Sequence, residues 1–252
     1  MSHTSYAPKR TFLVNSATTG NGTNYLMRGN IPLKKDGATF AYDEMNTRFK
    51  ELISDGSFDL ANYNLIDISV ITNYPTTEPG EGFYLMAEFL AYGISNADYN
   101  KWFPQSVWPP FMTKQCPQFA VPQGSTINGN SGSIIWYPVQ GCDPAGTCST
   151  IEPQQYNPVG LVDMLNTLLN TANANGKPTL IYYHCINGHD RTSALTACYM
   201  MRWMGSTYTF DYVTTTPAPK GAMLENNHGV QWNPPYINLV KYYSENCLPQ
   251  VR

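Results

Sequence analysis

The stretch TLIYYHCINGHDRTSALTACYMMRWMG, residues 179–205, decides the fold of this chain. Residues 179–185 are β-rich and almost continuously apolar or aromatic, which is typical of a central strand in a parallel sheet. Residues 192–205 have the pattern of a helix that ends at Gly205. The residues between them are polar and include Gly188. The stretch therefore predicts a buried strand, a tight loop and a helix, in that order.

Segments of the same two kinds alternate along the rest of the chain. Runs of β-branched and aromatic residues favour strands, and apolar residues at steps of three and four favour helices. The predicted strands are 25–33, 63–71 and 132–139, and the predicted helices are 42–56, 79–94, the segment from the Asn157 cap to Gly176, and 236–247. This alternation predicts an α/β fold with a mostly parallel central sheet flanked by helices.

The length of 252 residues allows one large domain that buries its own core. Residues 1–24 are polar and rich in Gly, Thr and Asn, so we expect an extended N-terminal arm. Residues 25–252 are expected to form a single domain. Within it, residues 95–132 are dense in Pro, Gln, Asn and Trp, which predicts an irregular insertion.

The composition limits the partners of the chain. Charged residues make up 13% and the net charge is −3, so no overall field favours nucleic acid or an anionic membrane. The longest nearly apolar run, residues 82–94, contains Glu88 and is too short to cross a bilayer. No apolar stretch of signal-peptide length opens the chain. The polar but weakly charged composition nevertheless favours an exported protein over a cytoplasmic one, and the oligomeric state stays open.

Six cysteines are present, and two of them bracket a short loop. Cys142 and Cys148 enclose the sequence DPAGT and could close a small disulfide in an oxidising compartment. They could equally be two free thiols, and the sequence leaves both states open. The spacings around Cys116, Cys198 and Cys247 lack the paired pattern of a zinc site.

The loop at residues 185–191 lies where ligands bind in α/β sheets, between a strand end and a helix start. The first amides of a helix have no backbone partner, and the helix dipole adds partial positive charge there. A tight loop can add its own amides to form an anion nest. We therefore expect a phosphate-sized dianion to rest on this backbone. The residues expected to bind it are Ile186, Asn187, Gly188, His189, Asp190 and Arg191.

Four side chains suit nucleophilic chemistry on that phosphate. The same field stabilises a thiolate, so the pKa of Cys185 should be lowered and its sulfur can attack phosphorus. Arg191 offers a planar fork for two phosphate oxygens. Thr192 can donate its hydroxyl to the sulfur. His184 is expected to point away from the nest and to orient the loop through backbone hydrogen bonds. Gly188 permits a turn that a Cβ would obstruct.

The pattern H-C-x5-R-[ST] with an internal Gly resembles the signature of the cysteine-dependent tyrosine and dual-specificity phosphatases. Its five specified residues would occur by accident on the order of once in ten thousand chains of this length. The upstream segments YLMRGNIP and IIWYPV are also similar to that superfamily, over about residues 25 to 205. The resemblance implies a tyrosine-phosphatase-like fold, a phosphocysteine intermediate, no metal or other cofactor, and a mobile carboxylic acid.

That acid must protonate the leaving oxygen of the ester. In the superfamily it is an Asp on a loop upstream of the nucleophile. Asp143 follows the strand IIWYPV but lies 42 residues before Cys185, and Glu152 lies 33 residues before it, nearer to the usual spacing. We favour Asp143 and keep Glu152 as the alternative. Gln231 is a candidate for positioning the attacking water.

The loop sequence bears on the substrate. C-x-x-G-x-D-R-T resembles myotubularin-like lipid phosphatases and bacterial tyrosine phosphatases, and His189 stands where the latter have Lys. Without that lysine, a highly charged inositol polyphosphate is less favoured. Asp190 is expected to orient the loop through its amides or Arg191. Expected substrates are phosphorylated protein or inositol-based phosphoesters. The rival interpretations are a catalytically silent phosphate-binding interaction domain and, from another class, a rhodanese-like sulfur transferase, which lacks the Arg-Thr closure.

Overall fold

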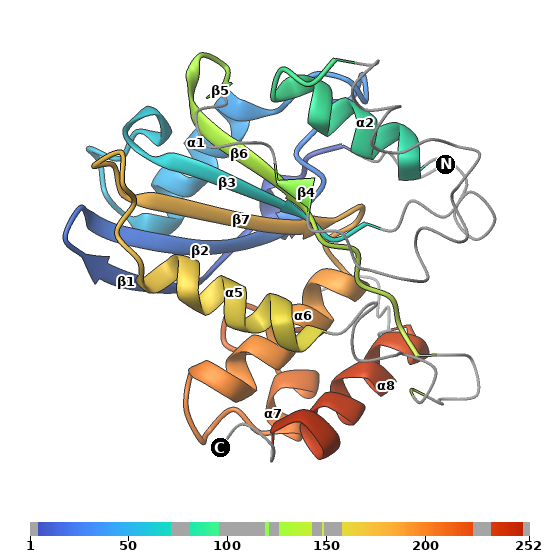
Figure 1. The fold of residues 1–252 in the computed structure, drawn as a ribbon. Helices are drawn as coiled ribbons and strands as arrows, with labels where there is room; N and C mark the ends of the chain where they lie inside the picture. Colours follow the sequence, from blue (N-terminus) through green and yellow to red (C-terminus); the bar gives the residue numbers. More distant parts are fainter. Residues whose placement is uncertain are drawn as a thin grey trace.

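A computed structural model of the chain describes residues 5–71, 81–95, 119–120, 126–142, 148, 158–223 and 233–248. Strands and helices alternate along these residues (Figure 1). The strands are β1 (Phe12–Thr19), β2 (Gly22–Asn30), β3 (Asn64–Ser69), β4 (Phe119–Ala120), β5 (Thr126–Ile127), β6 (Asn130–Trp136) and β7 (Thr179–Cys185). The helices are α1 (Tyr42–Ile53), α2 (Glu81–Ala91), α5 (Pro158–Asn170), α6 (Asp190–Trp203), α7 (Phe210–Thr215) and α8 (Pro234–Tyr242). Short helical turns lie at Pro8–Arg10, Leu60–Asn62 and Tyr243–Cys247.

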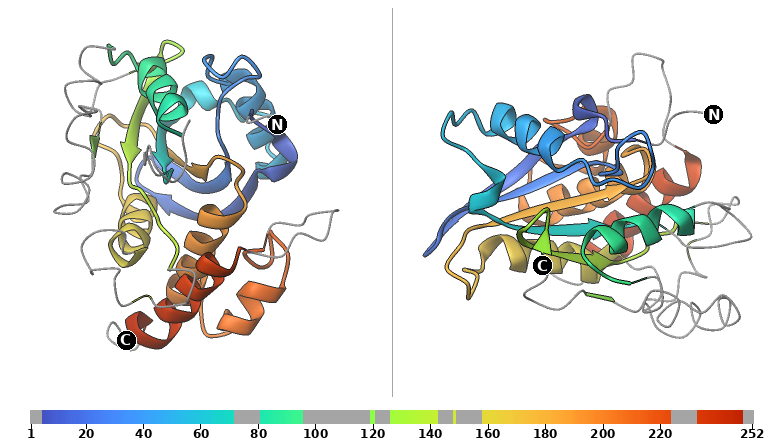
Figure 2. Two further views of the ribbon diagram at one scale, coloured as in Figure 1. Left: turned by 90° about the vertical axis from the view of Figure 1, so that its right-hand side faces the viewer. Right: turned by 90° about the horizontal axis from the view of Figure 1, so that it is seen from above.

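The strands form one sheet in the order β1-β2-β7-β3-β6-β4, and β5 pairs with β6. β2, β7, β3 and β6 run parallel to their neighbours in this series, whereas β1, β4 and β5 are antiparallel. Helices α1 and α2 lie on one face, and α5, α6, α7 and α8 lie on the other (Figures 1 and 2). The predicted α/β class, with a mostly parallel sheet flanked by helices, is confirmed.

β7 is the central strand, and all its residues are buried. It pairs with β2 on one side and with β3 on the other. The Tyr182 ring lies 5.8 Å from the Phe49 ring of α1, and the Tyr183 hydroxyl lies 2.6 Å from the Thr196 hydroxyl of α6. Side chains alternate along a strand. The last two residues of β7 therefore also point to opposite faces of the sheet.

The N-terminal residues differ from the expected arm. Residues 12–19 form β1, which pairs antiparallel with β2 and makes one edge of the sheet, and β2 begins at Gly22 rather than near residue 25. Most side chains of β1 are only partly buried or exposed. An edge strand of this kind needs few apolar residues, and its polar composition therefore hides it in the sequence.

The predicted irregular insertion at residues 95–132 contains short strands where the structure describes it. β4 and β5 both pair antiparallel with β6, and β6 itself begins at Asn130. These two-residue strands are too short to show a period in the sequence. The rest of the insertion, residues 96–118 and 121–125, lies outside the described residues.

The predicted helices are present, but α5 ends at Asn170 rather than at Gly176, and α7 is an addition. α7 is not predicted, because its six residues show no apolar period. The signal of this helix is its cap, since the Thr209 hydroxyl accepts a hydrogen bond from the Tyr212 amide. Among the helices of the described residues, none combines the length and the apolar character needed to cross a membrane.

Candidate active site

The loop that joins β7 to α6 lines a cavity of about 620 Å³. Cys185 and Arg191 both face this cavity, together with Ile186, Asn187 and Asp190. The opposite walls come from the start of α2, the segment after β6 and the start of α8. The cavity therefore lies at the carboxyl end of the central strand, at the position predicted for the anion site.

Three successive carbonyl oxygens of the loop are held by donors outside it. The Ile31 amide donates to Ile186 O at 3.2 Å, Arg10 Nη1 donates to Asn187 O at 2.9 Å, and Arg28 Nη2 donates to Gly188 O at 2.9 Å. In a trans peptide the N–H points opposite to the C=O. The amides of residues 187–189 therefore point away from these donors. Within the described part of the chain, no amide of residues 186–190 donates a hydrogen bond, so this backbone is available to an anion.

Gly188 is required by the turn of the loop. Its φ is +67°, a conformation that side chains with a Cβ rarely adopt. A Cβ at this position would also lie 2.7 Å from the carbonyl oxygen of Gly29 in β2. The loop can therefore approach β2 closely only with glycine here, as the sequence predicts.

Arg28 is a structural residue of the site that sequence analysis did not single out. Its guanidinium is buried, and burial lowers its pKa. It donates to Gly188 O, to Ser193 Oγ at 2.7 Å and to Ala222 O at 2.5 Å. One side chain of β2 thus fixes the loop, the start of α6 and the segment after α7.

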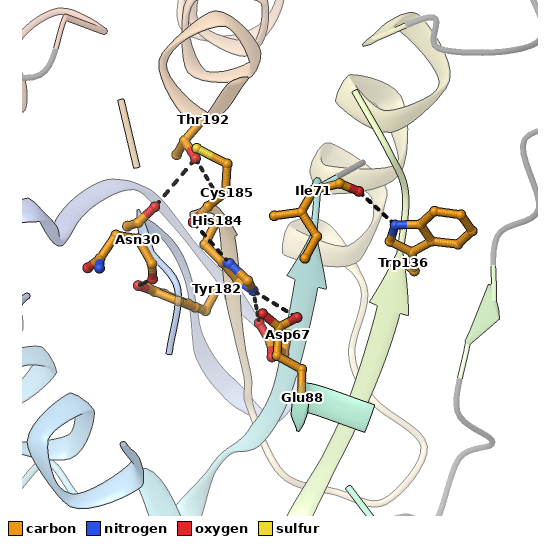
Figure 3. Close-up of polar contacts among 10 residues, drawn as sticks. Asn30, Asp67, Ile71, Glu88, Trp136, Tyr182, His184, Cys185 and Thr192 are labelled. Carbon is orange, nitrogen blue, oxygen red and sulfur yellow. Dashed lines mark hydrogen bonds and ion pairs between the residues drawn. The ribbon is translucent and has the colours of Figure 1, made fainter. Parts of the chain in front are cut away.

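Cys185 is buried at the end of β7, with 4% of its surface exposed. Its amide donates to Thr192 Oγ1 at 2.8 Å, and the Thr192 hydroxyl lies 3.4 Å from Gly29 O, to which it donates (Figure 3). The sequence predicted that the Thr192 hydroxyl donates to the Cys185 sulfur. In the structure it donates to the backbone carbonyl of Gly29 instead. The backbone carbonyl needs a donor in this buried position, which explains the difference.

Arg191 is held on two edges of its guanidinium. Nη1 forms a buried ion pair with Glu81 Oε1 at 2.6 Å, and Nε donates to the Tyr236 hydroxyl at 3.0 Å. Glu81 opens α2 and Tyr236 lies in α8, and both line the cavity. Sequence analysis missed both residues, because nothing local distinguishes a carboxylate or a phenol that meets its partner only in the folded chain.

Asp190 and His189 form a pair at the rim of the loop. His189 Nδ1 lies 3.0 Å from Asp190 Oδ1, and the Asn233 amide donates to the same oxygen at 3.1 Å. Burial opposes ionisation, but these hydrogen bonds hold the pKa of Asp190 below its usual value. Asp190 therefore orients the loop, as expected, but its partners are His189 and the start of α8 rather than loop amides or Arg191. His189 does not line the described cavity.

His184 points to the other face of the sheet, toward α2. Its Nε2 lies 3.2 Å from Asp67 Oδ1 and 3.7 Å from Glu88 Oε2, and its Nδ1 lies 3.4 Å from the Cys185 carbonyl oxygen (Figure 3). All three side chains are fully buried. Burial raises the pKa of Glu88 to about 8, and it also raises the pKa of Asp67. Burial alone would lower the pKa of His184, but the two neighbouring carboxylates outweigh it and raise that pKa to about 9.

Cys142 and Cys148 form a disulfide, one of the two states that the sequence left open. Cys142 lines the cavity, and its amide donates to Pro235 O at 2.9 Å. Cys148 Sγ lies 3.6 Å from Asn238 O. The Cys142 end is therefore hydrogen-bonded to α8, and Cys148 lies beside the same helix. The carboxylic acids Asp143 and Glu152, and Gln231, lie outside the described residues.

Replacing Arg28 with Met tests its role in holding the loop. The change leaves three buried acceptors without a donor, so we expect the free energy of unfolding to fall by about 3 kcal/mol. The matched control is Arg202→Met, because Arg202 pairs with the partly exposed Asp163 and should cost less than about 1 kcal/mol. Urea unfolding of the two variants measures the difference. Equal losses would contradict the role given to Arg28.

The described site thus combines a buried cysteine with an arginine that Glu81 and Tyr236 hold in place. The loop between them has three carbonyl groups bonded to donors outside it, and all these groups surround one cavity. Comparisons of the chain with protein-family models, with curated proteins and with solved structures found no match. The chemistry of the cavity is therefore inferred from its own residues and geometry.

Proposed function

We propose that this chain is a metal-independent phosphomonoester hydrolase that works through a phosphocysteine intermediate. The observation that carries the proposal is the loop at the end of β7. Its carbonyls at residues 186–188 are held by outside donors, its amides are turned the other way, and Cys185 and Arg191 face the same cavity. A phosphate group bound on those amides would meet both side chains.

The reaction then follows from these groups. The Cys185 thiolate attacks phosphorus, the P–O bond to the leaving group breaks, and a carboxylic acid gives that oxygen a proton. Asp143 or Glu152 supplies this proton. Water next attacks the phosphocysteine, the S–P bond breaks, and inorganic phosphate leaves. Arg191 binds the equatorial oxygens throughout, because Glu81 and Tyr236 fix its plane.

The walls of the cavity favour phosphotyrosine over a multiply phosphorylated inositol. Among its described lining residues Arg191 is the only cation, and it is already paired with Glu81. Asp190 adds a second carboxylate. Tyr84 and Tyr236 offer aromatic surface beside the loop. A single phosphate on an aromatic ring fits this charge balance better than a polyphosphate.

The tyrosine-phosphatase-like fold and the exported location belong to the same proposal. A parallel central strand that ends in the cysteine loop and continues into α6 supports the first. The Cys142–Cys148 disulfide supports the second, because disulfides persist in oxidising compartments.

Replacing Cys185 with Ser tests the nucleophile. We expect hydrolysis of a phosphotyrosine peptide to fall by at least about a thousandfold, since an unactivated hydroxyl cannot replace the thiolate. Cys247→Ser, at a half-buried cysteine outside the cavity, should keep the parent rate. Phosphate release is measured for both. Full activity in Cys185→Ser would rule out the cysteine mechanism, and a parent chain that binds phosphate without turnover would indicate a silent binding domain.

A second pair of variants identifies the acid. With an alkyl phosphate, whose leaving group needs a proton, the rate of Asp143→Asn should fall by about a hundredfold or more. Glu152→Gln should lose little. With para-nitrophenyl phosphate, whose leaving group needs less help, the loss in Asp143→Asn should shrink. A rate loss confined to Glu152→Gln would move the role to that residue.

A further inference from the structure

We propose that Asp67, Glu88 and His184 form a binding site for one divalent transition-metal ion, with Zn²⁺ as the best fit. The site lies between α2 and the sheet, on the face opposite to Cys185. It holds the ion structurally and takes no part in the proposed hydrolysis. The proposal is therefore independent of the proposed function.

The three side chains come from separate elements and converge on one point. Asp67 lies in β3, Glu88 in α2 and His184 in β7, and Figure 3 shows both carboxylates directed at the imidazole. Their nearest ligand atoms all lie within 4.8 Å of one another. Nothing in the chain sequence places these residues together, since they are brought there by sheet register and helix packing.

The spacing of the donor atoms suits a single small ion. His184 Nε2 lies 3.2 Å from the Asp67 oxygen and 3.7 Å from the Glu88 oxygen. An ion with bonds of about 2.1 Å to nitrogen and oxygen holds tetrahedral neighbours about 3.4 Å apart. The observed distances lie on either side of that value.

Polar atoms without hydrogen bonds are concentrated at this point. In the described part of the chain, both oxygens of Asp67, both oxygens of Glu88 and Nε2 of His184 are buried without a hydrogen bond of good geometry, and they form ion pairs among themselves. The Ser69 hydroxyl is buried as well, and Ser69 is the sheet partner of His184 and lies close enough to Glu88 for its hydroxyl to interact with that carboxylate. Buried polar atoms of native proteins are satisfied by protein, water or ions. The buried atoms of Asp67, Glu88 and His184 therefore point to a bound ion.

The second nitrogen of His184 supports ligation. A carbonyl oxygen can only accept, so Nδ1 donates its proton to the Cys185 carbonyl at 3.4 Å. In the neutral ring, Nε2 then presents a lone pair between the two carboxylates. Histidines that bind metals commonly donate their other ring N–H to a carbonyl or carboxylate in this way.

The charge of the site favours a divalent cation. Two carboxylates without exposed surface are costly in a protein interior unless they are neutralised. One divalent ion balances both charges and leaves the imidazole neutral. A donor set of one nitrogen and two or three oxygens suits Zn²⁺ and its first-row neighbours, whereas Ca²⁺ and Mg²⁺ prefer oxygen alone.

The ion would join α2 to the two central strands behind the cysteine loop. Glu81, in the same helix, holds Arg191, and His184 directly precedes Cys185.

The metal content of the purified full chain, measured by inductively coupled plasma mass spectrometry, should be about one divalent ion per chain. In Asp67→Asn and Glu88→Gln it should fall at least about tenfold. Glu81→Gln, the same change in the same helix, should keep the ion.

A second measurement uses the parent chain alone and does not depend on folding of a variant. The protein is unfolded with chelator, its disulfide left intact, and refolded with Co²⁺, with Zn²⁺ or without metal. Bound Co²⁺ should produce visible absorption bands of a tetrahedral site, and either ion should raise the melting temperature. A parent chain that takes up neither ion and melts at the same temperature would overturn the proposal and leave the trio sharing protons. Metal that persists in Asp67→Asn and Glu88→Gln would overturn it as well.

Discussion

The rest of the site depends on three hydrogen bonds that residues near and within β2 donate to carbonyl oxygens of the loop between β7 and α6. Each carbonyl turned toward Ile31, Arg10 or Arg28 turns the following amide the other way. The close approach of Gly188 to β2 belongs to the same constraint, because a side chain there would separate the loop from the strand. The parallel pairing of β2 with β7 therefore sets the position of the amides, and Cys185 follows from it as the last residue of β7.

Helix α2 lies on one face of the sheet (Figure 1), but its acidic side chains contact residues that belong to both faces. Glu81 and Glu88 are seven residues apart and thus lie on one side of the helix, two turns from each other. The first carboxylate reaches Arg191 at the cavity, and the second reaches His184 behind it. Displacement of this helix would therefore disturb the arginine and the residue before the cysteine together. Two buried acidic residues in a short apolar helix have their explanation in these two partners.

The sequence predicted those parts of the molecule whose signals are local. β7, the loop and α6 follow from an uninterrupted apolar run, a glycine and a polar turn within one stretch. β1 was missed because an edge strand carries mostly polar, partly exposed side chains. Arg28, Glu81 and Tyr236 were missed because each meets its partner across a long separation in the chain. The direction of the Thr192 hydroxyl likewise depends on a carbonyl of β2 that no motif specifies.

The account as a whole depends on a covalent bond between phosphorus and the sulfur of Cys185. Mass spectrometry of protein quenched with acid during turnover of a phosphotyrosine peptide tests this most directly. The account predicts one additional phosphoryl group, located by fragmentation on the peptide that contains Cys185. Release of phosphate with no phosphoryl group on that peptide at any quench time, or with the group on another residue, would contradict it.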